Sequence, residues 1–308
     1  MGMSSVTFAI LSDVHVYTSA GSSPSAGIPS NLPKVVAQLR SLSPDFVVVS
    51  GDATSGNPDD GASRQKVDGW WRGFKQALAP LTEAGIPILP IAGNHDYYTD
   101  NQRQGFHAAW AQLTEDTHGH FVLSGEPPLF YSLQMGALHL CLLHVIDQDL
   151  QSRVAAFLKA DAEQTPDDSL KLCIGHVPLV SMMGRTSTSY RDELGGLLVR
   201  LGYSAYFAGH EHLVWEQLLS LQEGNLHHIH VGTGSGTYNF PLSRSTYDAH
   251  CADGVGTLPY SGRRFALFPG TREQADKTNV CLVQVTDGTY SVQPLTLRGD
   301  ELQPFGLD

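Results

Sequence analysis

Five short polar clusters along this chain carry side chains that can bind metal ions. They are Asp13-Val14-His15, Gly51-Asp52, Gly93-Asn94-His95-Asp96, Gly175-His176 and Gly209-His210-Glu211-His212. Carboxylate, amide and imidazole donors without a thiolate suit Mn, Fe or Zn, whereas a calcium site would take oxygen ligands only. The clusters therefore indicate a transition-metal site built from residues that are far apart in the sequence.

Each cluster lies at or just beyond the end of an apolar run that is typical of a buried strand. Because the carboxyl ends of strands in α/β folds line a common crevice, we expect the clusters to meet there. In an extended segment the side chains at i and i+2 share one side, so Asp13 with His15, and His210 with His212, could each present two ligands. Four clusters also place a glycine before the ligand, where the missing β-carbon lets the backbone turn and approach an ion.

The elements that would position these clusters alternate in the first half of the chain. Short β-branched runs at 6–11, 46–50 and 86–92 predict strands, and apolar residues at helical spacing over 32–39 and 67–78 predict helices between them. Ser30 and Asn31 are possible caps of the first helix, with Pro33 near its first turn. This alternation predicts an α/β fold.

From residue 129 on, strand patterns dominate and a second sheet is expected. The predicted strands are 129–134, 137–146, 170–175, 204–209 and 227–232, with Met135-Gly136 joining the first two. Asp287-Gly288 between two alternating runs is a strong hairpin signal. We expect one domain over 1–308, in which strands within 271–308 complete a sheet.

Composition excludes some function classes. The 308 residues carry a formal net charge of -12 and no run of Lys or Arg, which disfavours binding to nucleic acid. No stretch of 18 apolar residues predicts a membrane span, and the opening apolar run at 6–11 is too short for a signal peptide. Three of the four cysteines, Cys141, Cys173 and Cys281, lie in strand-like surroundings and suit reduced, buried thiols in the cytoplasm, while Cys251 is undecided.

The series D-x-H, G-D, G-N-H-D, G-H and G-H-x-H, in this order, resembles the calcineurin-like metallophosphoesterase superfamily from residue 6 to about residue 215. The resemblance implies a four-layer α/β/β/α sandwich of two mixed sheets with metals at one edge. After Asp52 the chain reads Ala-Thr-Ser-Gly, and Asp96 stands where serine/threonine protein phosphatases have Glu. The chain is therefore more similar to the bacterial phosphodiesterase and phosphomonoesterase branch.

The resemblance also implies a role for each matching residue. Asp13, His15 and His212 would hold a first ion, Asn94, His176 and His210 a second, and Asp52 would bridge two divalent or trivalent ions of Mn, Fe or Zn. Such ions share a hydroxide that attacks phosphorus at neutral pH without a protein base. His95 would protonate the leaving-group oxygen or steady the phosphate charge. Asp96 would orient His95 by holding one ring nitrogen.

The substrate is expected to be a small organic phosphate, such as a nucleotide or a phospholipid head group. Side chains that could face its phosphate or ring are Tyr97, Tyr98, Arg103, Arg185 and Tyr190. The aperiodic stretches 16–30 and 237–270 could cap the cleft. A non-catalytic metal-binding scaffold and a nuclease remain as alternatives. The other histidines are assigned to the surface or to packing, except His230, which could line the cleft; the sequence gives no oligomeric state.

Overall fold

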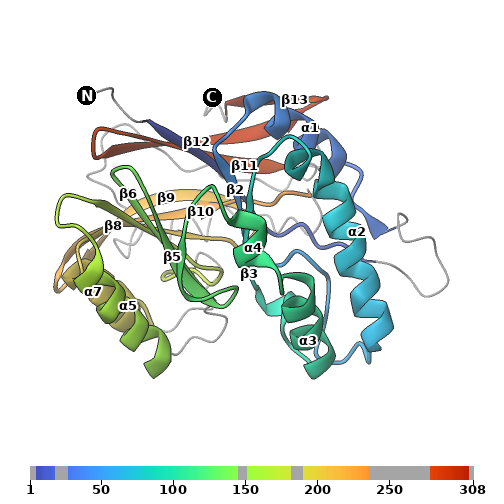
Figure 1. The fold of residues 1–308 in the computed structure, drawn as a ribbon, viewed down its shortest axis with the longest axis horizontal. Coiled ribbons are helices and arrows are strands. Elements are labelled where there is room, and N and C mark those ends of the chain that lie inside the picture. The colour runs from blue at the N-terminus through green and yellow to red at the C-terminus, as the bar shows by residue number, and fades with distance from the viewer. Residues whose placement is uncertain (1–4, 18–26, 145–150, 182–189, 236–277, 305–308) are drawn as a thin grey trace, which may run out of the picture.

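The computed structural model describes residues 5–17, 27–144, 151–181, 190–235 and 278–304. Two mixed sheets lie face to face, and helices cover the outer side of each (Figure 1). The α/β prediction with four layers is therefore confirmed. Most of the aperiodic stretches 16–30 and 237–270, with their predicted capping role, lies outside the described residues, as do Cys251 and Arg185.

The first sheet has the strand order β13-β12-β11-β1-β2-β3. Its members are β1 (Val6–Leu11), β2 (Phe46–Ser50), β3 (Ile88–Ile91), β11 (Asn279–Thr286), β12 (Thr289–Arg298) and β13 (Glu301–Pro304). β1, β2 and β3 are parallel, and β11 pairs with β1 in the antiparallel direction. Strands from both ends of the chain thus form one sheet.

The second sheet has the order β4-β5-β6-β7-β8-β10-β9. Its members are β4 (Leu123–Glu126), β5 (Phe130–Met135), β6 (Leu138–Leu143), β7 (Leu170–Ile174), β8 (Tyr203–Ala208), β9 (Val214–Leu221) and β10 (Gly224–Val231). β6, β7, β8 and β10 run parallel to their neighbours in that order. β4 and β9 are additions that the sequence patterns did not predict.

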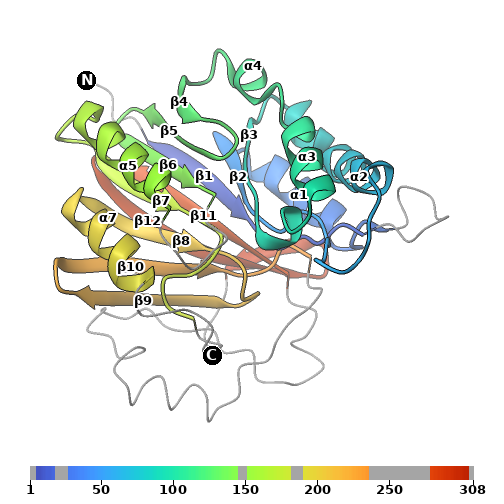
Figure 2. The ribbon, with the colours of Figure 1, turned by 90° about the horizontal axis from the view of Figure 1, so that it is seen from below.

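Helices cover the first sheet on one side of the molecule and the second sheet on the other (Figures 1 and 2). On the first side lie α1 (Leu32–Leu42), α2 (Arg64–Thr82), α3 (Asp100–Ala109) and α4 (Leu113–Thr117). On the second side lie α5 (Ser152–Gln164), a π-helical turn (Arg191–Gly195) and α7 (Gly196–Arg200). Alternate residues of the second sheet face the inner core and the core beneath α5 and α7, because successive strand side chains point to opposite faces.

The apolar residues whose spacing predicted α1 and α2 are buried as expected. Leu32, Val35, Val36 and Leu39 face the core. Pro33 sits in the first turn, where its missing N–H costs no helical hydrogen bond. Asn31 is the N-cap residue, but its side chain does not cap the helix. Its Nδ2 instead donates to Thr278 Oγ1 at 2.9 Å.

The two predicted hairpins form. Asp287 and Gly288 have φ values of 50° and 73° between β11 and β12, the positive values that a type I′ turn needs. β5 and β6 are also antiparallel neighbours, but the turn is shifted by one residue. Met135 still pairs with Leu138 in the ladder, so Gly136 and Ala137 make the turn, and Gly136 supplies the positive φ of 58°.

Two further expectations concern cysteines and membranes. Cys141, Cys173 and Cys281 are buried, as predicted, and Cys141 and Cys173 are free thiols. Within the described part of the chain, no helix is both long and apolar enough to cross a bilayer.

Candidate metal centre

The candidate ligands lie in the loops that follow five strands. β1, β2 and β3 are parallel, as are β7 and β8, so within each sheet these strands end at a common edge. Asp13 and His15 follow β1, Asp52 follows β2, Asn94 follows β3, His176 follows β7, and His210 and His212 follow β8. Side chains separated by up to about 200 positions in the sequence come within hydrogen-bonding distance there.

The first group of donors consists of Asp13, His15 and His212. His212 Nε2 lies 3.1 Å from Asp13 Oδ1 and 3.0 Å from His15 Nε2, and the three side chains are buried. One oxygen and two imidazole nitrogens thus face one another. Their donor atoms all lie within 4.8 Å of one another, a spacing that a single cation could bridge.

The second group contains Asn94, His176 and His210. Asn94 Oδ1 lies 3.1 Å from His176 Nε2 and 2.8 Å from His210 Nδ1. Asp52 completes this group, because its Oδ2 lies 3.2 Å from His176 Nε2. The same oxygen is 3.9 Å from His15 Nε2 in the first group, so Asp52 stands between the two groups.

The donor chemistry fits a pair of metal ions. Ligands bound at about 2.0–2.2 Å from one ion must lie roughly 3–4 Å apart, which is the spacing found in each group. Oxygen and imidazole donors suit Mn, Fe or Zn. The structure thus places all seven predicted ligands at one edge of the sandwich, in two groups that share Asp52.

Two candidate ligands are held as carboxylates. Burial raises the pKa of Asp52, but the neighbouring histidines, His176 foremost with His15 and His95, together outweigh burial and bring the pKa of this carboxyl well below its usual range. Burial also raises the pKa of Asp13, but His212 and His176 together outweigh burial and lower it. Asp13 further accepts hydrogen bonds from Ser12 Oγ at 2.6 Å and from the backbone N–H of His210. Both carboxyl groups are therefore ionised, the form that binds cations.

The histidines differ in charge. Burial lowers the pKa of His15 and of His210 to about 4, so both rings are neutral at pH 7. Burial also lowers the pKa of His176, but Asp52, Asp13 and the hydrogen bond to Ser50 O together outweigh burial and raise it to about 9. Because an imidazole must be deprotonated to bind a cation, His176 would lose a proton on metal binding.

His95 lies beside both groups, and its ring is fixed by a backbone carbonyl. Its Nδ1 donates to Gly56 O at 2.6 Å, which leaves Nε2 as the nitrogen that can exchange a proton. The backbone N–H of His95 donates to Asp52 Oδ1 at 2.8 Å. A ring nitrogen of His95 also lies within 4.8 Å of donor atoms of His15 and Asp52. Geometry thus permits both the predicted proton-transfer role and a ligand role.

The predicted contact of Asp96 with the His95 ring is wrong. In the described part of the chain, the Asp96 carboxylate accepts from the backbone N–H groups of Ala53, Thr54 and Gly93 and from Thr54 Oγ1, at 2.8–3.2 Å. Asp96 therefore ties the loop after β2 to the loop after β3. Burial raises its pKa to about 6, with the charge of Asp52 adding to the rise.

The backbone of the ligand loops is strained. Asp13, His15, Asp52, His210 and His212 have φ values of 52°, 55°, 50°, 71° and 55°, in the left-handed region that side chains with a β-carbon rarely adopt. The expectation of an extended D-x-H segment is therefore wrong, although both of its side chains still reach the site. Such conformations cost about 1–3 kcal/mol each and concentrate at functional sites.

Two of the glycines are required by the ligands themselves. A β-carbon on Gly93 would collide with the Asp52 carboxylate and backbone, and one on Gly51 would lie 2.5 Å from His176 Nδ1. Gly51 also has a φ of 96°. The space beside each glycine is therefore filled by ligand residues of the neighbouring loops. We had expected this space to let the backbone approach an ion.

The sequence matches a known family over most of its length. A family model described as calcineurin-like phosphoesterase covers residues 6–214, which include all five clusters. The chain belongs to this family. Its histidine and aspartate groups could bind the metals that members of this family use. No curated protein matches its sequence significantly.

Solved structures share the fold of this calcineurin-like phosphoesterase at low sequence identity. A purple acid phosphatase from yellow lupin seeds is 13% identical with a TM-score of 0.64, over 98% of this chain and 53% of that one. The chain thus spans about half the length of the lupin protein. A dimetal phosphatase from Danio rerio is 13% identical with a TM-score of 0.52, over 93% of this chain and 98% of that one.

A third structure with the fold comes from a protein described as an anchor. GAP50, the anchor in the inner membrane complex of Plasmodium, is 13% identical with a TM-score of 0.59, over 97% of this chain and 86% of that one. At this identity each of these likenesses shows the fold alone.

The predicted substrate contacts of this phosphoesterase that the structure describes are buried or engaged with neighbouring residues. Tyr190 is fully buried in the core beneath the helices of the second sheet, so solvent does not reach it. Arg103 is engaged near the start of α3, where it donates to the carbonyls of Tyr97 and Tyr98 and pairs with Asp100. The Tyr97 hydroxyl lies 2.9 Å from His107 Nε2.

Glu211, between the two histidines of the last cluster, is a supporting residue that the sequence patterns missed. It is buried, accepts from Ser181 Oγ, and lies 3.4 Å from His230 Nδ1. His230 in turn lies 3.2 Å from Val180 O. The single residue between the ligands of G-H-x-H thus binds the loop that follows His176. The signal available in the sequence was an acidic residue inside a ligand motif.

His144 was assigned to the surface or to packing, and it packs beside the site. Its ring lies 4.2 Å from that of Tyr97, and its Nδ1 is 3.3 Å from Ala92 O. Burial lowers the pKa of His144 to about 4, partly opposed by the hydrogen bond to Ala92. The ring is therefore neutral in the folded protein at neutral pH.

The neutral His144 ring makes folding depend on pH. Its folded pKa lies below the unfolded value of about 6.5, so the unfolded chain binds the extra proton and stability falls as pH drops from about 6.5 towards 4. This group alone should remove about 1–2 kcal/mol between pH 7 and pH 5. In urea unfolding with chelator present, the free energy of unfolding of His144→Gln should fall by that much less between pH 7 and pH 5. The exposed His118 provides a control, since His118→Gln should keep the original slope. A slope unchanged by His144→Gln would contradict a neutral His144.

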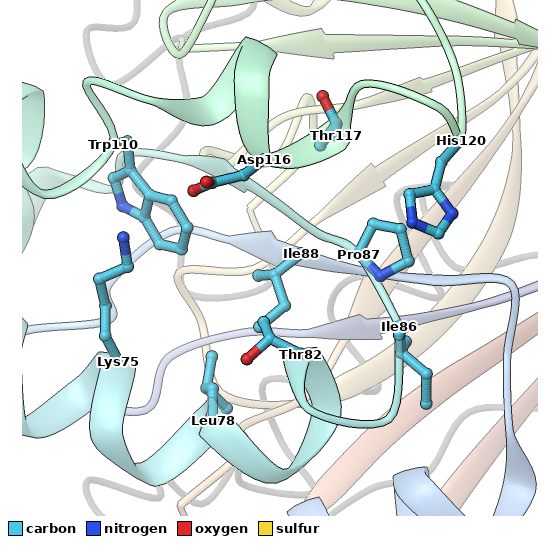
Figure 3. A pocket seen from close by; sticks show the side chains of 11 residues that line it. Lys75, Leu78, Thr82, Ile86, Pro87, Ile88, Trp110, Asp116, Thr117 and His120 are labelled. Atoms are coloured by element: carbon cyan, nitrogen blue, oxygen red, sulfur yellow. The ribbon is translucent and has the colours of Figure 1, made fainter.

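A separate cavity lies at the other end of β3 (Figure 3). It measures about 320 Å³ and is bordered by Ile86 and Ile88, at the amino end of the strand, and by Lys75, Trp110 and His120. Lys75 Nζ lies 4.7 Å from the centre of the Trp110 ring and donates to Ala109 O. The described residues that line this cavity include none of the candidate ligands, so it is not part of the metal centre.

Proposed function

We propose that this phosphoesterase hydrolyses a small organic phosphate, as a phosphodiesterase or phosphomonoesterase of the bacterial type, with two metal ions of Mn, Fe or Zn. Asp13, His15 and His212 would hold one ion, Asn94, His176 and His210 the other, and Asp52 both. The observation that carries the proposal is the pair of donor groups joined through one Asp52 oxygen, with His95 beside them.

When bound, such a pair of ions lowers the pKa of a water molecule and neutralises phosphoryl oxygens as charge develops. The protein supplies the remaining functions. His95 would deliver a proton from Nε2 to the leaving-group oxygen, because its Nδ1 is committed to Gly56 O. Asp52 would position His95 as well as the ions, since its Oδ1 accepts the His95 backbone N–H.

Metal dependence is the first test of this function. The protein freed of metal with a chelator should be inactive on p-nitrophenyl phosphate and on bis-p-nitrophenyl phosphate. Added Mn²⁺ should restore turnover of at least one of them, and the ratio of the two rates would separate monoesterase from diesterase activity. Protein shown to contain two ions per chain, yet without turnover on either compound, would contradict the proposal.

A non-catalytic scaffold is the second candidate, and the likeness to the Plasmodium anchor favours keeping it. It predicts metal binding without turnover in the same assay. The complete donor set with His95 beside it supports the enzyme instead. A nuclease is disfavoured by the net charge of -12. Because Cys141 and Cys173 are buried free thiols, we also propose a cytoplasmic location.

A further inference from the structure

Tyr98 contacts the side-chain amide of Asn94. Asn94 Nδ2 donates to the Tyr98 hydroxyl oxygen at 2.5 Å. The other end of the amide, Oδ1, faces His176 and His210 at 3.1 and 2.8 Å. The two ends of the Asn94 amide therefore meet different partners, and only the oxygen end can bind a cation.

A side-chain amide no longer binds a metal ion if it rotates so that its NH₂ end faces the site. Its NH₂ and C=O ends are nearly the same size, so a rotated Asn94 would fit the same space but direct N–H groups towards the histidine nitrogens. The Tyr98 hydroxyl, by accepting from Nδ2, anchors the amide in the position where Oδ1 faces the site and so restrains its rotation. Tyr98 is placed for this task, because it follows Asn94 by four residues, just beyond the single short helical turn Asn94–Asp96.

We propose that Tyr98 is a positioning residue for the second metal ion, acting by holding the Asn94 amide with Oδ1 towards His176 and His210. This inference rests on the proposed function, because it assumes that Asn94 is a ligand. Groups that orient metal ligands typically contribute 10–100-fold to metal affinity. The role of Tyr98 is therefore in binding the metal rather than in the chemical step.

The Tyr98→Phe variant isolates the hydroxyl. The Tyr98 ring packs edge-on against His95 with centroids 5.4 Å apart, and its exposed fraction is 38%. Phenylalanine keeps this ring contact and adds no volume. Tyr97→Phe is the matched control, because the Tyr97 hydroxyl contacts His107 rather than Asn94.

Calorimetric titration of the metal-free protein with Mn²⁺ provides the test. The unsubstituted protein should bind two ions. In Tyr98→Phe one of the two affinities should fall about 10–100-fold while the other is unchanged, and Tyr97→Phe should alter neither. Saturating Mn²⁺ should restore kcat in Tyr98→Phe with KM unchanged, because the site, once filled, is the same.

An Asn94→Asp background sharpens the test. A carboxylate has an oxygen at both ends, so its orientation needs no guidance, and Tyr98→Phe should have a much smaller effect there. Unchanged affinities in Tyr98→Phe, equal losses at both sites, or the same loss in the Asn94→Asp background would each overturn the inference. Two ions bound without any turnover would instead refute the proposed function and leave the role of Tyr98 standing.

Discussion

Replacing His95 by alanine is expected to lower kcat by about 10²–10⁴-fold while both metal ions stay bound, because the change removes proton transfer but no ligand. The ring is held by Gly56 O and the backbone by Asp52, so the loop after β3 keeps its anchor to Asp52 when the ring is removed. The measurements are steady-state kinetics at saturating Mn²⁺ and the metal content of the purified variant.

The control for this variant is His118→Ala, which removes an exposed histidine from the end of α4 and should leave kcat unchanged. The decisive outcome is metal content. If His95→Ala lost an ion, His95 would be a ligand, as the closeness of its ring nitrogen to the donor atoms of His15 and Asp52 permits.

The second large effect is expected at Asp52. Asp52→Asn should lower the affinity for both ions by more than the 10–100-fold typical of residues that only orient a ligand. The reason is that the amide lacks the negative charge that both donor groups share. Activity should fall with occupancy and recover only partly at high Mn²⁺. Calorimetric titration of the metal-free variant measures both affinities, and circular dichroism confirms that it folds.

Asp161→Asn is a matched control for Asp52→Asn. Asp161 is another buried carboxylate paired with a histidine, since its Oδ2 lies 2.7 Å from His139 Nε2 under the second sheet. Its loss should lower the free energy of unfolding but leave both metal affinities intact. If Asp52→Asn bound both ions as tightly as the unsubstituted protein, the shared position of Asp52 would be wrong.

The fold and the convergence of the ligands could be predicted because they depend on patterns that local sequence records. Apolar runs followed by polar clusters marked the carboxyl ends of strands, and parallel strands bring those ends together. The Asp287-Gly288 hairpin was equally local. β9 was missed because its residues follow the ligands His210 and His212 directly and were not recognised as a strand.

The interpretation was weakest where a partner comes from a distant loop. Asp96 is next to His95 in sequence, yet its carboxylate faces the loop after β2, which sequence order does not show. The Gly56 carbonyl that orients His95 is a backbone group and has no sequence signature. The positive φ of Asp13 and His15 could not be predicted either. Glycine is the usual sequence signal of this conformation, and neither residue is glycine.

One consequence follows from where the ligand loops originate. Asp13, His15, Asp52 and Asn94 follow strands of the first sheet, whereas His176, His210 and His212 follow strands of the second. Each proposed ion would therefore take ligands from both sheets and act as a cross-link between the two halves of the sandwich. Separating the halves would require releasing the ions, so metal supply would set the lifetime of the folded protein as well as its catalytic rate.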